Sequence, residues 1–315
     1  MSIEEKTLHM MGTKIDLMVD SRNSNMLLKK LAHDLNVYEA RFNANDPQSE
    51  LMALHHHAGV TPVTVHDDLY ELIAIGKKHS LKTPSYLNIA LGPLVKQWHI
   101  GFDDAKKPSD DLITGALALT DPALIELDGD KKTVYLPKKG MEIDLGALAK
   151  GYIADRIIST CKHQAATTGF INLGGNFLSF GPSPKRASGY YRIGIQDPTK
   201  PRGNYMLAVD TLNQSVVTSG VYERQLKQGN QSYHHIFDPK TGYPIETDIL
   251  SLTIISDTSL EGEIFSTRLF GLSVKDILSF VNDSNNIDVI IITKERQIHL
   301  SETIKHHIVP LSHSI

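Results

Sequence analysis

The sequence of 315 residues contains a single cysteine, Cys161. One cysteine excludes an internal disulfide bond and a metal site built from cysteine ligands. No stretch approaches the roughly 20 consecutive apolar residues that a membrane-spanning helix needs. The 32 basic and 36 acidic residues give a formal charge of −4, which does not suggest a general nucleic-acid-binding protein. With 41% hydrophobic and 22% charged residues, the composition is typical of a soluble globular protein.

Three common catalytic signatures are also missing from the sequence. There is no Gly-x-x-x-x-Gly-Lys-Ser/Thr loop, which excludes a P-loop enzyme. There is no Gly-x-Gly-x-x-Gly after a predicted strand, which argues against a Rossmann dinucleotide site. There is no Gly-x-Ser-x-Gly elbow of the kind that carries a nucleophilic serine. The chemistry must therefore be sought in other motifs.

Hydrophobic periodicity predicts helices and strands in mixed order. Helices are expected at 25–38, 50–54, 67–79, after Gly92-Pro93, from Lys150 onward, and at 261–270 and 274–281. Strands are expected at 7–19 with an interruption at Gly12, around a hairpin at 125–136, at 141–144, at 169–181 with a break at Gly174-Gly175, and at 190–198, 206–209, 215–220, 233–238, 250–256, 287–293 and 304–309. Residues 101–113 read as a polar surface excursion. No linker divides the chain, so we predict one domain over residues 1–315 with an α+β architecture.

The run His55-His56-His57 has two interpretations. Histidine is a common metal ligand, which would make the run a metal site. Consecutive residues on a helix point in different directions, so three adjacent histidines make a poor single site. We therefore favour a solvated helix end.

The segment from Met141 to Arg156 carries the clearest signal for a ligand site. Only Leu, Gly and Ala lie between Asp144 and Lys150, and small residues let the backbone approach a ligand closely. The start of the predicted helix favours phosphate, and Lys150 adds a cation at the same end. Taken alone, the segment fits a phosphate site and a salt-bridged strand-to-helix connection equally well.

Glu263 and Thr267 stand four residues apart on a predicted helix and therefore share a face. A carboxylate with a hydroxyl forms a pair of hard oxygen ligands suited to Mg²⁺. The alternative is a capped, solvated helix face, which the spacing by itself favours.

The order of the motifs resembles the FAD:protein FMN transferases of the ApbE family, from about Met11 to Gly271. The matching segments are Met11-Gly-Thr13, the loop 42–51, Gly92-Pro93-Leu94 with Trp98, Asp144 to Tyr152, Asn172 to Gly175, Gln196 to Pro198, Thr218 to Gly220, His235 to Gly242, and Ser266-Thr267. The resemblance implies a T-fold-like α+β core and a reaction in which Mg²⁺ and FAD are used to attach FMN to an acceptor flavoprotein. The acceptor residue is a Ser or Thr followed by Gly-Ala-Thr, and AMP leaves.

The resemblance also implies a role for individual residues. The FAD-contacting set implied by the match comprises Met11, Asn45, Tyr86, Leu87, Asn88, Asp144, Lys150 and Ile236. The magnesium set comprises the backbone carbonyl of Ala147 and the side chains of Glu263 and Thr267. His235 is the candidate base for the acceptor hydroxyl, because an unperturbed pKa of about 6.5 suits proton transfer at neutral pH. His234 is expected to face the other side of its strand.

The chain departs from the family pattern at Glu263, where the family usually has Asp, and at Asn88, where it often has Asp. Two alternative functions stay open at this level: an FAD pyrophosphatase, in which water replaces the acceptor hydroxyl, and a non-catalytic FAD-binding protein. The first residues, Met1 to Lys6, show no secretion signal and no lipidation cysteine, so we expect a cytoplasmic location. The sequence leaves a homodimer open.

Overall fold

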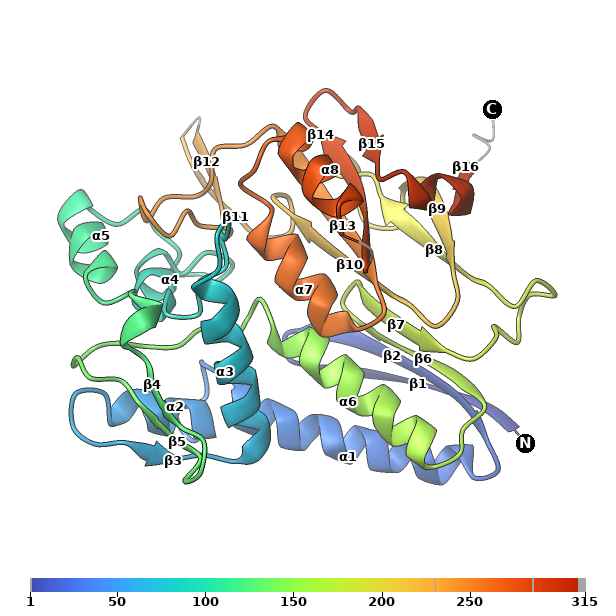
Figure 1. The fold of residues 1–315 in the computed structure, drawn as a ribbon, viewed down its shortest axis with the longest axis horizontal. Coiled ribbons are helices and arrows are strands. Elements are labelled where there is room, and N and C mark those ends of the chain that lie inside the picture. Colours follow the sequence, from blue (N-terminus) through green and yellow to red (C-terminus); the bar gives the residue numbers. More distant parts are fainter. Residues whose placement is uncertain (1, 230, 285, 311–315) are drawn as a thin grey trace.

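The structure, a computed structural model, describes residues 2–229, 231–284 and 286–310. An eight-stranded sheet runs through the molecule in the order β1-β2-β6-β7-β10-β13-β14-β15, and every neighbouring pair is antiparallel (Figure 1). Its strands are β1 (Ser2–Met10), β2 (Thr13–Ser21), β6 (Thr168–Leu173), β7 (Asn176–Phe180), β10 (Ser215–Gly220), β13 (Ile249–Ser256), β14 (Ile287–Thr293) and β15 (Ile298–Leu300).

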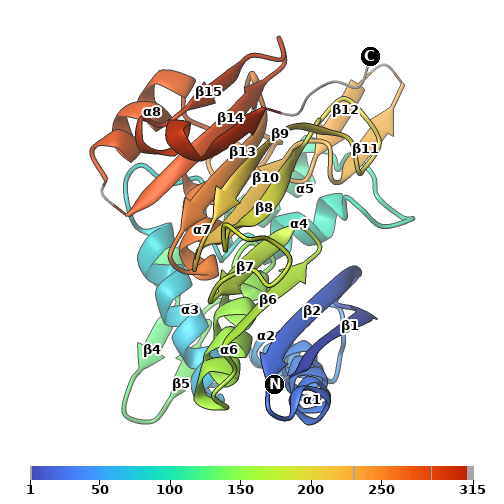
Figure 2. The same ribbon diagram turned by 90° about the vertical axis from the view of Figure 1, so that its right-hand side faces the viewer.

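Four helices cover one face of this sheet, as Figure 2 shows from the side. They are α1 (Ser24–Phe42), α6 (Ala149–His163), α7 (Ser259–Arg268) and α8 (Val274–Asn282). Alternate strand residues point to this face: Leu17 and Val19 of β2 join the core under α1 and α6, while Met18 points to the opposite face. The alternation of apolar residues that predicts the strands thus also decides which side chains meet the helices.

The opposite face of the sheet packs against a three-stranded sheet in the order β16-β9-β8. Its strands are β8 (Tyr191–Gln196), β9 (Tyr205–Thr211) and β16 (Ile308–Pro310), with the 3-10 helix η2 (Thr303–His307) leading into the last. Because both faces of β13 and β14 are covered, these strands are buried along almost their whole length instead of alternating between buried and exposed residues.

The remaining elements form a lobe beside the large sheet, at the left of Figure 1. It comprises α2 (Glu50–His56), α3 (Asp67–Ser80), α4 (Gly92–Trp98), α5 (Asp110–Leu117), the 3-10 helix η1 (Pro122–Leu124) and the sheet β3-β5-β4 with β3 (Val63–Thr64), β5 (Thr133–Tyr135) and β4 (Glu126–Asp128). The two-stranded sheet of β11 (Gln225–Gln228) and β12 (Gln231–His234) lies next to this lobe. No helix in the described part of the chain combines the length and apolar character needed to cross a bilayer.

The mixed α+β architecture predicted from the sequence is confirmed, with differences in detail. Gly12 does not interrupt one strand: Met10 pairs with Thr13, which leaves Met11 and Gly12 as a two-residue turn between β1 and β2. Both turn residues have positive φ, 54° and 67°, as a type I′ turn requires. Gly174-Gly175 forms a second tight turn, between β6 and β7.

The strand predicted at 141–144 is wrong. No β-strand is assigned between β5 and α6. The N–H of Ile143 donates instead to Nε2 of His55 at 2.9 Å, and the N–H of Asp144 donates to the carbonyl of Ile89 at 2.8 Å. Their backbone donors are taken by a side chain and a loop, which an apolar pattern does not reveal.

Two other predictions need correction. The excursion predicted at 101–113 ends in helix α5, whose first turn is capped by the hydroxyl of Ser109. The strand predicted at 304–309 is a 3-10 helix followed by the short β16.

Candidate active site

The site is organised by a close contact between α6 and α7 at Gly151. A Cβ atom at residue 151 would lie 2.6 Å from the carbonyl oxygen of Ser259 and 2.8 Å from Cγ of Glu263. The two helices can approach this closely only because residue 151 has no side chain. Lys150, one residue earlier, is thereby brought beside Glu263.

Glu263 is a buried carboxylate with two partners. Only 4% of the surface of Glu263 is exposed. Its Oε1 atom accepts a hydrogen bond from Nδ2 of Asn176 at 2.8 Å and lies 3.3 Å from Nζ of Lys150. The hydroxyl of Ser259 in turn donates to Oδ1 of Asn176. A buried carboxylate needs such partners, and Asn176 and Lys150 together fix its direction.

Two further oxygen atoms come from the hydroxyl of Thr267 on α7 and from the carbonyl of Ala147 just before α6. Thr267 is half-buried one helical turn after Glu263, on the same face of α7. At the start of α6, the N–H of Tyr152 bonds to the carbonyl of Leu148, and no backbone N–H of the described residues donates to the carbonyl of Ala147. In residues 2–229, 231–284 and 286–310, no three His, Cys, Asp or Glu side chains converge on one point. A cation site here would therefore rest on one carboxylate with neutral oxygens.

Asp144 is held in a turn that leads into α6. Its Oδ1 atom accepts a hydrogen bond from the N–H of Gly146 at 2.6 Å, an Asx-turn that reverses the chain before the helix. Burial raises the pKa of Asp144, while the N–H of Gly146 and the charge of Arg224 act in the opposite direction. Asp144 thus lies within the electrostatic reach of Arg224.

His235 and His234 have different surroundings, and β12 ends at His234, so His235 follows the strand rather than lying within it. His234 uses both ring nitrogens: Nδ1 accepts from the N–H of Ile236 at 3.2 Å, and Nε2 lies 3.0 Å from the carbonyl of Ile245. His235 has one weak contact, from Nδ1 to the carbonyl of Arg224 at 3.4 Å. A carbonyl accepts only from a protonated nitrogen, so this contact places the proton on Nδ1 and leaves the lone pair on Nε2.

The pKa of His235 is lowered to about 4, first by burial and then by the positive charges of Arg224, His234 and Lys150, against the contact with the Arg224 carbonyl. The ring is therefore neutral at pH 7 and can accept a proton. The positive charge of Lys150 lowers the pKa of His235, and its Nζ atom contacts Glu263 directly. Through these contacts and fields the structure brings together Asp144, Lys150, His235 and Glu263, which are far apart in the sequence.

The other predicted FAD-contacting residues have structural contacts of their own. The N–H of Met11 donates to Oε1 of Glu39 at 2.7 Å, and the N–H of exposed Asn45 donates to Oδ1 of Asn43 at 2.9 Å. Both therefore lie at the C-terminal end of α1. Leu87 is buried in the main core, and Ile236 packs on the core beneath α7 and α8.

Tyr86 and Asn88 join the loop before α4 to its surroundings. A Cβ atom at Gly271, just after α7, would lie 2.3 Å from the ring of Tyr86, so this ring rests on the bare backbone there. Asn88 donates from Nδ2 to the carbonyl of Thr120 at 2.8 Å and accepts at Oδ1 from the N–H of Ala90 at 2.8 Å. An aspartate cannot donate to Thr120, which gives a structural reason for an amide at residue 88.

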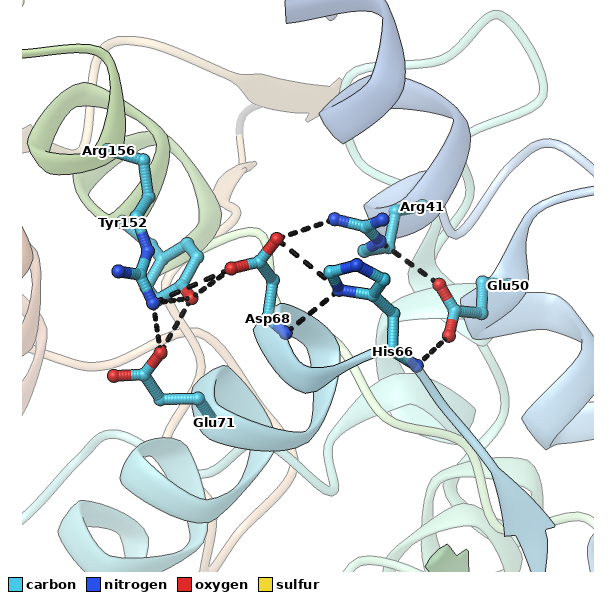
Figure 3. A network of polar contacts seen from close by, with 7 residues as sticks. All are labelled: Arg41, Glu50, His66, Asp68, Glu71, Tyr152 and Arg156. Carbon is cyan, nitrogen blue, oxygen red and sulfur yellow. Dashed lines mark hydrogen bonds and ion pairs between the residues drawn. The ribbon is translucent and has the colours of Figure 1, made fainter. Parts of the chain in front are cut away.

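A polar network fixes α6 against α1 and α3 (Figure 3). The hydroxyl of Tyr152 lies 2.9 Å from Oδ1 of Asp68 and 2.8 Å from Oε2 of Glu71, both on α3. Arg41 of α1 reaches the other oxygen of Asp68 at 2.7 Å. Arg156, one turn after Tyr152, donates to Glu71 and to the tyrosine oxygen. Burial and the two carboxylates raise the pKa of Tyr152, so the hydroxyl stays protonated.

Three residues at the site were not identified from the sequence: His55, Asn176 and Arg224. Interpreting His55 as part of a solvated helix end is wrong, because its ring is half-buried and accepts from Ile143. Asn176 follows the Gly-Gly turn, and Arg224 follows Gly220 by four residues. For Asn176 and Arg224 the only signal was their position beside small-residue motifs, which does not distinguish them from ordinary loop residues.

Comparison with known proteins agrees with this geometry. The model of the ApbE family matches residues 11–291. A protein named FAD:protein FMN transferase from Klebsiella pneumoniae (strain 342) is 39% identical over 298 residues, which cover 91% of this chain and 92% of that protein. A protein of the same name from Treponema pallidum (strain Nichols) is 34% identical over 274 residues, covering 84% of this chain and 76% of that protein.

Solved structures agree as well. The crystal structure of the ApbE protein from Thermotoga maritima matches with a TM-score of 0.88 and 26% identity, covering 97% of this chain and 99% of that one. The family match extends from the turn between β1 and β2 to β14 and so includes every predicted site residue. The chain belongs to the ApbE family.

Proposed function

We propose that this protein transfers FMN from FAD to a Ser or Thr hydroxyl of an acceptor flavoprotein and releases AMP. The two relatives named FAD:protein FMN transferase, which align with most of the chain, support this activity. The observation that carries the proposal is the contact of Lys150 with buried Glu263 beside the neutral ring of His235. It combines a cation for phosphate, a fixed carboxylate and a proton acceptor.

The reaction needs a base for the acceptor hydroxyl and charge neutralisation at the pyrophosphate. The hydroxyl oxygen forms a bond to the FMN phosphorus, the bond from that phosphorus to the bridging oxygen breaks, and AMP leaves with the bridging oxygen. The hydroxyl proton passes to Nε2 of His235. The negative charges of FAD offset the positive charges of Arg224 and Lys150, which lower the pKa of His235. Bound substrate therefore raises the proton affinity of His235 when it is needed.

Lys150 and Asp144 hold the dinucleotide in this account. Lys150 lies in the first turn of α6, where the helix dipole also favours an anion, so its ammonium group can contact a phosphate oxygen. Asp144 is fixed in direction by the N–H of Gly146 and can accept a hydrogen bond from a polar group of FAD through its free oxygen. The loop of Tyr86, Leu87 and Asn88, with Met11, Asn45 and Ile236, would line the rest of the ligand.

The residues present fit a magnesium ion. The carboxylate of Glu263, the hydroxyl of Thr267 and the carbonyl of Ala147, which receives no backbone N–H from the described residues, are the hard oxygen donors that Mg²⁺ prefers. These three residues would hold the ion. When bound, Mg²⁺ neutralises charge on the pyrophosphate oxygens. Asn176 keeps the Glu263 carboxylate in place for this role.

The test uses purified protein, FAD, Mg²⁺ and an acceptor that carries the Ser/Thr-Gly-Ala-Thr sequence. In-gel flavin fluorescence of the acceptor is expected, and it is expected to vanish with EDTA or when the acceptor hydroxyl is replaced by Ala. Chromatography of the same mixture reports FMN and AMP. Release of both at the same rate with and without acceptor, with no fluorescent acceptor, would replace the transferase proposal by a pyrophosphatase.

A further inference from the structure

Arg224 lies at the site although it is not among the predicted FAD or metal ligands. It stands between β10 and β11, and its side chain passes directly over Gly101 in the loop after α4. A Cβ atom at residue 101 would lie 2.8 Å from Cδ of Arg224, and Gly101 has a φ of 101°. The backbone of Gly101 therefore provides a flat surface on which the aliphatic part of the arginine lies.

The guanidinium group has no acidic partner in the described part of the chain. Its neighbour Glu223 pairs instead with Arg202. The residue is exposed, and no ion pair or side-chain hydrogen bond within residues 2–229, 231–284 and 286–310 involves its guanidinium. An arginine carries five N–H donors in a planar fork that matches two oxygens of a phosphate. Among the described residues, none occupies these donors, so they can bind a ligand.

The position of Arg224 is tied to the reacting groups. Its carbonyl contacts Nδ1 of His235 at 3.4 Å, so the base and the arginine share one backbone link. Its charge acts on both Asp144 and His235, and the charge of Lys150 also acts on His235. The charges of two cations from different parts of the chain, Arg224 and Lys150, therefore act on His235. A ligand with negative charge on two neighbouring phosphates is complementary to such a pair.

We propose that Arg224 is a phosphate-binding residue of the active site, whose guanidinium group contacts the pyrophosphate oxygens of the dinucleotide opposite Lys150. This role rests on the proposed FMN transfer. As the bond to the bridging oxygen breaks, negative charge builds up on the phosphate of the leaving AMP. Because the aliphatic part of Arg224 already lies on Gly101, its guanidinium group stabilises that charge with little reorganisation. Arg224 thus acts on binding and on the bond-breaking step.

The experiment compares Arg224→Gln and Arg224→Lys with the matched control Lys227→Gln. Lys227 is an exposed cation on β11, three residues along the same segment. Each charge-assisted hydrogen bond contributes about 1.5–3 kcal/mol, so Arg224→Gln is expected to lower kcat/KM for FAD roughly 10- to 100-fold. Arg224→Lys keeps the charge without the fork and is expected to recover part of the loss. Lys227→Gln is expected to stay within about twofold of the wild type.

Two further measurements separate phosphate binding from a structural role. FAD binding is measured by fluorescence, and the binding of inorganic pyrophosphate is measured by its competition with FAD. Arg224→Gln should bind both ligands more weakly than the wild type, whether or not an acceptor is present. The acid limb of the kcat/KM profile should move to higher pH in Arg224→Gln, because His235 loses one of the cations that lower its pKa, while Lys150 and His234 remain. A structural role would not move this limb.

The outcomes are distinct. If the wild type transfers FMN and Arg224→Gln matches it in kcat/KM, pyrophosphate binding and the acid limb, the role of Arg224 alone is overturned. A wild type that binds FAD but transfers no FMN would overturn the proposed function, and the pyrophosphate titration would still decide the role of Arg224. Thermal unfolding is expected to be unchanged, since the side chain is exposed; if Arg224→Gln unfolds early, Arg224→Lys supplies the same comparison.

Discussion

The Nζ atom of Lys150 lies 3.3 Å from Oε1 of Glu263. The residue that is expected to hold the dinucleotide is thus the counter-ion of the carboxylate that is expected to hold the metal. A divalent cation held at Glu263 would repel the ammonium group and leave it available for a phosphate. The proposed metal and dinucleotide halves of the site would then be coupled through one buried oxygen atom.

The coupling gives a prediction for Lys150→Met. Removing the ammonium group leaves the Glu263 carboxylate with Asn176 as its remaining partner, so Mg²⁺ no longer competes with a cation. Calorimetric titration without FAD is expected to show Mg²⁺ binding at least as tight as in the wild type, and fluorescence titration is expected to show FAD binding weaker by roughly tenfold or more. The control is Lys162→Met, at the exposed C-terminal end of α6. Parallel weakening of Mg²⁺ and FAD would contradict the coupling.

The contact of α6 with α7 predicts a large effect of Gly151→Ala. A Cβ atom there meets the Ser259 backbone at 2.6 Å, and backbone cannot move aside as a side-chain tip can. We expect a loss of about 1–3 kcal/mol in the free energy of unfolding and a strong drop in FMN transfer, because Lys150 and Glu263 separate. Urea unfolding and initial rates measure both.

Gly115→Ala is the matched control, since a Cβ at residue 115 within α5 meets no atom within 4 Å. It should be neutral or stabilise by up to about 1 kcal/mol. Equal behaviour of the two variants would show that the close approach at residue 151 does not position the site.

The network of Figure 3 predicts that Tyr152→Phe loosens α6. The change removes a hydroxyl shared between Asp68 and Glu71 and leaves both carboxylates with arginine partners. We expect a loss of about 1–2 kcal/mol in stability. FMN transfer should fall through kcat more than through KM for FAD, because the phenol itself points away from the ligand side towards α3. A stability equal to that of the wild type would mean that the arginines alone hold the helix.

The hydrogen bond from the N–H of Ile143 to His55 predicts that His55 positions the neighbouring Asp144. His55→Leu removes the acceptor of the Ile143 N–H, whereas His55→Gln supplies an amide oxygen near the place of Nε2. We expect His55→Leu to raise KM for FAD several-fold and His55→Gln to recover most of the affinity. The exposed neighbour His56→Leu is the control. Steady-state rates at varied FAD measure the series, and equal KM values for Leu and Gln would rule out the hydrogen bond as the cause.

The same ring makes stability depend on pH. Burial lowers the pKa of His55 to about 4, against the charge of Glu142 and the bond from Ile143, with Lys96 and His56 adding positive charge. Between pH 4 and about 6.5 the unfolded chain binds the proton more readily, so this contribution is fully present above pH 6.5 and lost as the pH falls towards 4. The full shift corresponds to roughly 3 kcal/mol. Urea unfolding of His55→Gln should show a shallower loss over this range; an identical slope would contradict it.

The sequence predicted the elements that periodicity governs and missed those that individual contacts govern. Helices α1, α3 and α8 and most strands of the large sheet were predicted within a few residues, because each presents a regular apolar pattern, whereas the short β15 was not predicted. The turn at Met11-Gly12 was missed, since one residue pair decides whether a strand continues or reverses. Residues 141–144 were misassigned because their partners are the His55 ring and the Ile89 carbonyl, which are remote in sequence.

The same limit applies to the site. Asp144, Lys150, Glu263 and His235 were found because the order of motifs resembles a known family. The contact between Lys150 and Glu263, the support by Asn176 and the place of Arg224 over Gly101 follow from helix packing at Gly151 and from loop conformations, which no local pattern encodes. Their roles in FAD and metal binding stay predictions.

Mass spectrometry of the acceptor after incubation with FAD and Mg²⁺ tests the central claim most directly. With the wild type, we expect one FMN, joined through a phosphoester, on the Ser or Thr of the target sequence. With Asp144→Ala or Glu263→Ala, we expect the modified fraction to fall by at least about tenfold at equal protein and time. An unmodified acceptor with the wild type, or equal modification by all three proteins, would contradict the assignment of this site to FMN transfer.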